Sequence, residues 1–245
     1  MGARGRPKRR AGLSRRGGGE MTALILQGRL DSKRLPGKSL LSLEGEPLIY
    51  RVMEALGTVP CDPHILACPE DCEETFRPLA RRAGFEIFAG PKDDVLGRYC
   101  GALRRCGSRR LIRATADNPF VFADAAALLA EESAALGADY AAYAGLPLGA
   151  GVEVLSAEAL FRAEREAREP GEREHVCPYL YGHPELFYLH RPLAPPRWRD
   201  RNPPVRLTVD TEEDYRRARK LYLALEEKAL RRFRGEAVLE AAHGR

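Results

Sequence analysis

The sequence has no apolar run long enough to cross a membrane. None of its hydrophobic stretches reaches the roughly 18 residues that a membrane-spanning helix needs. Its 245 residues also show no internal repeat, and a hydrophobic content of 44% is ordinary for a globular core, which excludes wholesale disorder. This length fits one large α/β domain or a domain with a small appendage.

The six cysteines follow no pattern typical of a disulfide framework. No two of them form a C-x-x-C pair, and no Cys/His pair has the spacing of a zinc finger. The N-terminal residues also lack the apolar segment of a secretory signal peptide. We therefore expect reduced thiols in a cytoplasmic protein.

Acidic residues are absent from residues 1–19, which hold seven Lys or Arg and six Gly. Residues 20–245 hold 33 basic and 35 acidic residues, so the net charge of +5 comes from the N-terminal stretch. The body of the chain therefore shows no general nucleic-acid-binding surface. We predict a disordered basic tail over 1–20. Either this tail is an arm for RNA or another anionic surface, or translation begins at Met21 and the tail is unused.

A buried strand followed by a cationic loop is the most informative stretch of the chain. Residues 22–38 read TALILQGRLDSKRLPGK, and their apolar start predicts a short strand. Gly28 opens the loop and Pro36-Gly37 predicts a turn at its end. Glycine lets backbone N–H groups approach a ligand, and arginine binds phosphate oxygens bidentately. The loop is therefore a candidate phosphate-binding site, although it lacks the residue spacing of a Walker A motif. The alternative is a basic loop that is simply exposed to solvent. Its cations are Arg29, Lys33, Arg34 and Lys38.

Short apolar segments alternate with helical patterns through the first 145 residues. This alternation predicts βαβ units on a mostly parallel sheet flanked by helices. The predicted strands cover residues 23–27, 64–68, 85–88, 110–115 and 139–143. Asp93 or Asp94 is placed to cap the helix that runs to about Cys106.

Residues 146–204 break this alternation. We predict an extended segment at 152–155, helices at 157–168 and 172–185, a strand at 187–190 and a loop with five prolines at 192–204. The region reads as a substrate or dimerisation subregion inserted into a single domain that spans 21–245. A strand at 205–209 and a helix starting at Asp210 or Thr211 are predicted to follow.

Two carboxylates follow predicted strands. Asp117 comes after 110–115 and Asp210 after 205–209, so we expect both at the edge of the sheet where sites of open α/β folds form. Facing the cationic loop, they would suit Mg²⁺ and a triphosphate, because Mg²⁺ prefers carboxylate and phosphate oxygens. The alternatives are structural: Asp117 starting a turn before Pro119, and Asp210 capping the next helix.

Six blocks of the sequence resemble the bacterial cytidylyltransferases that activate sugars for surface polysaccharides. The similarity is to the spore-coat-polysaccharide type and, more distantly, to acylneuraminate and 3-deoxy-manno-octulosonate cytidylyltransferases. The blocks keep family order over about residues 22–225. They are QGRLDSKRLPGK at 27–38, DDVLGRY at 93–99, DNP at 117–119, GLPLGAGVEV at 145–154, EREHVCPYLY at 172–181 and RLTVDTEEDY at 206–215.

The resemblance implies a Rossmann-like fold of the nucleotide-diphospho-sugar transferase type and a homodimer. It implies transfer of CMP from CTP to a sugar or sugar acid, with Mg²⁺ as cofactor and release of pyrophosphate. The implied metal ligands are Asp117 and Asp210, which act in catalysis with Arg29 and Lys38. The implied nucleotide-binding residues are Gln27, Gly28, Arg29, Arg34, Lys38, Asp94 and Arg98. The implied acceptor contacts are Glu153, Glu174 and His175.

Two other functions stay open at this point. A glycosyltransferase of related fold often carries Asp-x-Asp at a strand end, where this chain has Ala116-Asp117-Asn118, and it would leave the cationic loop with little to do. A non-catalytic RNA-binding module would have to rely on the tail, because the body is near neutral and lacks an aromatic stacking motif. The base for the attacking hydroxyl is either His175 or a metal-bound hydroxide.

Overall fold

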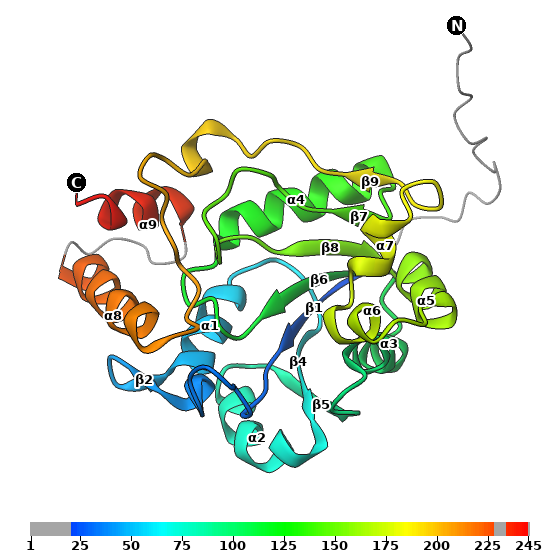
Figure 1. The fold of residues 1–245 in the computed structure, drawn as a ribbon, viewed down its shortest axis with the longest axis horizontal. Helices are drawn as coiled ribbons and strands as arrows, with labels where there is room; N and C mark the ends of the chain where they lie inside the picture. The colour runs from blue at the N-terminus through cyan, green and yellow to red at the C-terminus, as the bar shows by residue number, and fades with distance from the viewer. Residues whose placement is uncertain (1–20, 228–233, 245) are drawn as a thin grey trace, which may run out of the picture.

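A twisted sheet runs through the middle of the molecule with helices on both faces (Figure 1). The computed structural model describes residues 21–227 and 234–244, so the predicted tail at 1–20 lies outside the described residues, as do 228–233 and Arg245. The seven-stranded sheet has the order β5-β4-β1-β6-β8-β7-β9. Its strands are β1 (Thr22–Gln27), β4 (His64–Pro69), β5 (Glu86–Gly90), β6 (Arg110–Thr115), β7 (Tyr140–Ala141), β8 (Glu153–Ser156) and β9 (Leu189–His190). A small hairpin, β2 (Ser42–Leu43) and β3 (Glu46–Pro47), stands apart.

The predicted fold class is confirmed, since every strand of the large sheet except β8 points the same way. The central strand β1 pairs in parallel with β4 on one side and β6 on the other. Its residues Ala23 to Leu26 are fully buried, as expected for a parallel strand covered on both faces. The register sets Gln27 opposite Thr115, so both strands end at the same level.

Helices from the two halves of the chain cover each face. One hydrophobic core lies between the sheet and helices that include α1, α4 and α8, and a second lies under α3 and α5. In Figure 1, α3 and α5 to α7 gather on one side of the sheet and α8 and α9 on the other. Within the described ranges, none of the helices is both long and apolar enough to span a bilayer. The helices are α1 (Leu48–Leu56), α2 (Glu73–Arg82), α3 (Val95–Cys106), α4 (Ala123–Leu136), α5 (Ala157–Glu166), α6 (Pro170–His175), α7 (Pro178–Gly182), α8 (Glu212–Glu227) and α9 (Gly235–Ala242), with 3₁₀ turns η1 (Lys38–Leu40), η2 (Glu70–Cys72) and η3 (Pro196–Trp198).

The predicted strand at 205–209 is wrong. Both edges of β6 are already taken by β1 and β8, so this extended segment cannot pair beside β6 and forms only an isolated bridge, between Arg206 and Leu148. It crosses two loops instead: the amide of Leu207 donates to the Leu148 carbonyl at 2.8 Å, and the amide of Val209 donates to the Asp117 carbonyl at 2.8 Å. The second bond joins the segment that carries Asp210 directly to the residue that carries the other carboxylate.

The single helix predicted at 172–185 is also wrong, because the chain forms two short helices there. Pro178 cannot continue a helix from α6, since it lacks an N–H and its ring clashes with the preceding turn. Proline at the first position of α7 is favourable instead. Val176 between the helices has a φ of 69°, and the Cys177 amide donates to the His175 carbonyl at 2.8 Å. This sharp break ends α6 at His175, beside the site described below.

Residues 146–204 contribute to the sheet itself. Strand β8 lies between β6 and β7, and β9 forms the edge beyond β7. The strand predicted at 187–190 shortens to Leu189–His190, and that at 139–143 to Tyr140–Ala141. A role of this region in substrate binding or dimerisation stays a prediction.

The close packing of Gly149 against the 205–209 segment can be tested by substitution. Its φ is +93°, and a Cβ there would lie 2.4 Å from the Thr208 amide nitrogen. We expect Gly149→Ala to lower the free energy of unfolding by about 1–3 kcal/mol, through backbone strain and displacement of that segment. Chemical denaturation measures the change.

Gly182→Ala is the matched control, because a Cβ at Gly182 meets no atom within 4 Å. We expect it to change the free energy of unfolding by less than about 0.5 kcal/mol. Equal unfolding midpoints and slopes for the two variants would show that Gly149 is not constrained as described.

Candidate active site

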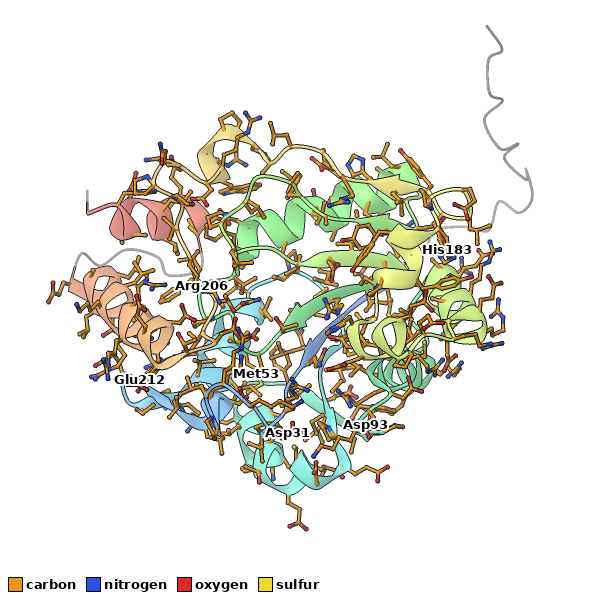
Figure 2. The ribbon with its side chains drawn as sticks, in the orientation of Figure 1. Asp31, Met53, Asp93, His183, Arg206 and Glu212 are labelled. Atoms are coloured by element: carbon orange, nitrogen blue, oxygen red, sulfur yellow. The ribbon has the colours of Figure 1, made fainter. Side chains whose placement is uncertain are left out.

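A cavity of about 990 Å³ opens where β1 and β6 end. Its walls come from the loop after β1, the residues around Asp94, the end of β6, helix α6 and Asp210. Figure 2 labels Asp31 and Asp93, two acidic residues that line the cavity, and Arg206, which contacts the lining residue Asp210 without lining the cavity itself. Eight Lys or Arg side chains and six carboxylates line this space, so it suits a charged ligand such as a phosphate ester better than an apolar one.

Lys38 joins the two predicted metal-ligand residues. Its Nζ donates to Asp117 Oδ2 at 2.9 Å and to Asp210 Oδ1 at 3.0 Å. A third bond, at 2.9 Å, goes to the Val209 carbonyl oxygen. The Lys38 side chain is only 14% exposed. The structure thus brings together three of the sequence-predicted catalytic residues from widely separated parts of the chain.

The remaining oxygens of these carboxylates also accept hydrogen bonds. Asp117 Oδ1 accepts from Thr115 Oγ1 at 2.7 Å. Asp210 Oδ1 pairs additionally with Arg34 Nη2 at 3.0 Å, and Asp210 Oδ2 accepts from Arg206 Nη2 at 2.8 Å. Both carboxylates are therefore held by cations and a hydroxyl while they face the cavity.

The alternative in which the Asp210 side chain caps α8 is wrong, because other residues make the capping hydrogen bonds. Thr211 Oγ1 accepts from the Asp214 amide at 3.2 Å, and the Asp214 carboxylate accepts from the amides of Asp210 and Thr211, each at 3.1 Å. Burial by itself raises the pKa of Asp214, but hydrogen bonds from Arg206, the Asp210 amide and the Thr211 hydroxyl outweigh burial and lower it. Thr211 and Asp214 cap α8, which leaves the Asp210 carboxylate to the cavity.

The cationic loop adopts the predicted turn at its end. Gly37 has a φ of +66°, and Lys38 begins η1 directly after it. Ser39 Oγ donates to the Arg29 carbonyl at 2.8 Å, which ties the two ends of the loop together. The Arg29 side chain lines the cavity and is half exposed, with its Nε 3.8 Å from Asp31 Oδ1. Arg29 is thus free to turn toward an anionic ligand.

Contrary to the expectation from the sequence, the backbone N–H of Gly28 does not face the cavity. Its amide donates to the Ala67 carbonyl at 3.1 Å, so this N–H is used by the sheet and not offered to a ligand. A Cβ there would lie 2.7 Å from Ile49 Cδ1, so close packing under the loop explains the glycine. The preceding residue, Gln27, does line the cavity, and its Oε1 is buried without a hydrogen-bond partner in the described part of the chain. Such an acceptor is suited to a donor from a ligand.

Helices α3 and α6 form the wall opposite the carboxylates. Asp94 caps α3 as predicted, accepting from the Gly97 amide at 2.9 Å, and Arg173 Nε donates to the same carboxylate at 3.1 Å. Burial by itself raises the pKa of Asp94, but the hydrogen bonds from Arg173 and Gly97 outweigh burial and lower it. Glu174 and His175, the next residues of α6, line the same wall.

Two sequence-predicted site residues lie behind the walls. Arg98 is buried, and its Nη1 donates to the carbonyls of Pro91 and Lys92, so it holds the loop before α3 in place. Glu153 accepts from Arg113 Nη1 and, at 2.8 Å, from the Tyr140 hydroxyl. Neither is among the residues that line the cavity.

Sequence reasoning missed three arginines of the site: Arg113, Arg173 and Arg206. Arg113 carries the clearest signal, because it is a charged residue in the middle of strand β6, between Ile112 and Ala114. Arg206 lies four residues before Asp210 in a segment expected to be a strand, where residues at this spacing lie about 13 Å apart and no ion pair is predicted. Arg173 carries no local signal, since its partner Asp94 is 79 residues away.

The residues around Lys38 Nζ fit a hard cation. Two carboxylate oxygens and one backbone carbonyl oxygen already surround a single positive charge there. Among residues 21–227 and 234–244, no group of three or more His, Cys, Asp or Glu side chains is arranged to hold a metal ion. Two carboxylates suit Mg²⁺ that takes its further ligands from phosphate and water, so Asp117 and Asp210 are the residues that would hold it.

Comparison with known proteins gives consistent matches over most of the chain. A protein family described as cytidylyltransferase matches residues 23–240. The spore coat polysaccharide biosynthesis protein SpsF of Bacillus subtilis (strain 168) is 32% identical over 205 residues, which cover 81% of this chain and 85% of that protein.

Two solved structures share the fold. A cytidylyltransferase from Leptospira borgpetersenii has a TM-score of 0.78 at 22% sequence identity. The match covers 89% of this chain and 91% of the Leptospira chain. A CMP:2-keto-3-deoxy-manno-octonic acid synthetase complexed with CTP has a TM-score of 0.64 at 14% identity, covering 86% of this chain and all of its own. At these identities the structural matches bear on the fold alone.

The ion pair between Asp94 and Arg173 has a measurable signature. Removing the guanidinium in Arg173→Gln should raise the pKa of Asp94, which a carboxyl ¹³C NMR titration follows. Because the pKa of Asp94 is lowered in the folded chain, its contribution to stability is full above the unfolded-state pKa and is lost as the pH falls through the folded-state pKa. Wild type should therefore exceed Arg173→Gln in stability at neutral pH and lose that advantage in acid.

Arg168→Gln is the control, because Arg168 lines the same cavity but its guanidinium donates to the Ala167 carbonyl. It removes the same charge without touching Asp94. An Asp94 pKa that moves equally in both variants would assign the effect to general charge and not to this pair.

Proposed function

Because the chain belongs to the cytidylyltransferase family, whose members are nucleotidyltransferases, we propose that it transfers CMP from CTP to a hydroxyl of a sugar or sugar-acid acceptor. The observation that carries this proposal is the convergence of Asp117, Asp210 and Lys38 at the edge of a cavity rich in cations. That arrangement suits a triphosphate and a divalent cation better than any neutral ligand.

In the proposed reaction the acceptor oxygen attacks the α-phosphorus of CTP. The new bond is the ester between that oxygen and the α-phosphorus, and the bond from the α-phosphorus to the oxygen bridging to the β-phosphate breaks. Pyrophosphate leaves with the electron pair of that bond. His175 lines the cavity and is the candidate to accept the hydroxyl proton, since an imidazole exchanges protons near neutral pH.

Positioning and charge neutralisation are the main tasks of the protein in such a transfer. Arg29, Arg34 and Lys38 follow one another along one loop, so the loop can place three cations against the phosphates. A bound Mg²⁺, held by Asp117 and Asp210, supplies charge neutralisation on the phosphate oxygens. Gln27 offers its buried acceptor from the floor of the same cavity.

The acceptor is proposed to bind along the α6 wall. Glu174 and His175 line the cavity there with Arg173, across from the carboxylate pair. By analogy with SpsF, whose name links that protein to spore coat polysaccharide, the product would serve synthesis of a surface polysaccharide or another glycan. The cytoplasmic location and the homodimer stay predictions.

A direct test removes one carboxylate. Asp210→Asn keeps the size of the side chain but weakens the pairing with Lys38, Arg34 and the cation. We expect the rate of pyrophosphate release from CTP and acceptor to fall by about a hundredfold or more, with the thermal unfolding transition retained. A coupled phosphate assay measures the rate after pyrophosphatase is added.

Glu213→Gln is the control, since the Glu213 side chain is 85% exposed on α8 and lies next to the capping residues without lining the cavity. It should keep the wild-type rate. Undiminished turnover by Asp210→Asn would exclude Asp210 from the reaction.

The glycosyltransferase alternative is separated by its donor. Purified protein is incubated with candidate sugar acids or sugar phosphates and either CTP or nucleotide sugars. We expect pyrophosphate with CTP and no sugar transfer from nucleotide sugars, because the loop at 29–38 offers cations for a triphosphate. Sugar transfer without pyrophosphate would establish the alternative.

A further inference from the structure

We propose that Lys38 is a built-in counter-cation of the metal site, so that the enzyme takes up its divalent cation together with the nucleotide and not before it. The proposal rests on the proposed metal-binding role of Asp117 and Asp210. It adds a coupling between two ligands of the site, and it assigns that coupling to one side chain.

The ammonium of Lys38 has no free hydrogen-bonding capacity in this structure. It carries three N–H donors, and it makes three short bonds, to Asp117 Oδ2, Asp210 Oδ1 and the Val209 carbonyl. All three acceptors are oxygen atoms of the kind that a hard divalent cation uses. The nitrogen therefore lies where the two carboxylates converge, at the position that such a cation needs.

The carboxylates have no unpaired oxygen to offer. Each of their four oxygens accepts at least one hydrogen bond, from Lys38, Arg34, Arg206 or Thr115. Lys38 and Arg34 already pair with these two carboxylates, and Arg206 is shared between Asp210 and Asp214. Lys38, with a side chain only 14% exposed, is held more firmly than Arg34, whose side chain is 66% exposed. A further cation meets carboxylates that Lys38 and Arg34 already neutralise, so it must displace the Lys38 ammonium or bind against its like charge.

A nucleoside triphosphate reverses this balance. Its phosphate oxygens supply several negative charges at the loop that carries both Arg34 and Lys38. Lys38 can leave the carboxylates for a phosphate without losing an ionic partner, and the oxygens of Asp117 and Asp210 then become available. The nucleotide also provides the further oxygen ligands that two carboxylates lack. By linkage, the nucleotide must tighten binding of the metal by the same factor by which the metal tightens binding of the nucleotide.

The test measures Mn²⁺ binding by electron paramagnetic resonance, using the full chain without acceptor, so that no turnover is needed. Wild type without nucleotide should bind Mn²⁺ weakly, and CTP should tighten that binding. Lys38→Gln without nucleotide should bind Mn²⁺ at least about tenfold more tightly than wild type, because the competing charge is gone. The further gain from CTP should be smaller in Lys38→Gln than in wild type.

Two variants control for charge and for structure. Lys92→Gln removes an ammonium that also bridges two carboxylates, Asp31 at 3.0 Å and Asp71 at 3.4 Å, and that lines the same cavity. It should leave Mn²⁺ affinity within about twofold of wild type. Lys38→Arg keeps a cation at the carboxylates and should retain the weak affinity of wild type.

The double variant Lys38→Gln/Asp210→Asn shows where the metal binds. It should lose the gain in affinity made by Lys38→Gln, and an unchanged gain would place the metal elsewhere and overturn the proposal. Unchanged Mn²⁺ affinity in Lys38→Gln, with a normal thermal unfolding transition, would also overturn it. Equal affinity of wild type with and without CTP, in a protein shown by a separate titration to bind CTP, would do the same. Because the titrations without nucleotide need no activity, they stand even if the chain proves to use a substrate other than CTP.

Discussion

The contact on which the site depends is the ammonium of Lys38 between two carboxylates. It joins three parts of the chain, since Asp117 is 79 residues and Asp210 172 residues from Lys38 in sequence. Two carboxylates at such close range repel each other, and a shared cation offsets that repulsion where the side chains are largely shielded from water. The same contact thus joins distant parts of the fold at one end of the sheet and gathers three oxygen atoms around one point.

The surrounding structure serves to hold these three residues in place. The parallel pairing of β1 and β6 brings the loop that carries Lys38 beside Asp117, because both strands end at the same level. The segment at 205–209 then brings Asp210 across, through the bond from the Val209 amide to the Asp117 carbonyl. The capping of α8 by Thr211 and Asp214 leaves the Asp210 carboxylate unused by the helix. On the far wall, the bond between Arg173 and Asp94 positions α6 and its polar residues.

Several features of the site could be predicted from the sequence because they depend only on residues that are close together along the chain. A glycine after a proline gives a turn wherever it stands, and Gly37 has the positive φ that this turn requires. An aspartate before a helical pattern caps the helix, and Asp94 does so. The apolar run of β1 predicted a buried parallel strand. The positions of Arg113, Arg173 and Arg206 could not be predicted in this way, because their partners belong to other elements of the fold.

By itself, the sequence determined the order of the elements, the turn and cap residues, and the family to which the chain belongs. Those properties depend on near neighbours or on blocks of residues that keep their order. Only the tertiary structure decided that 205–209 crosses loops instead of joining the sheet, that the Gly28 amide is used by β4, and that Arg98 and Glu153 lie behind the cavity walls. An extended segment has the same local pattern in either setting, and its hydrogen-bond partners are chosen by which sheet edges and loops remain available once the strands have paired.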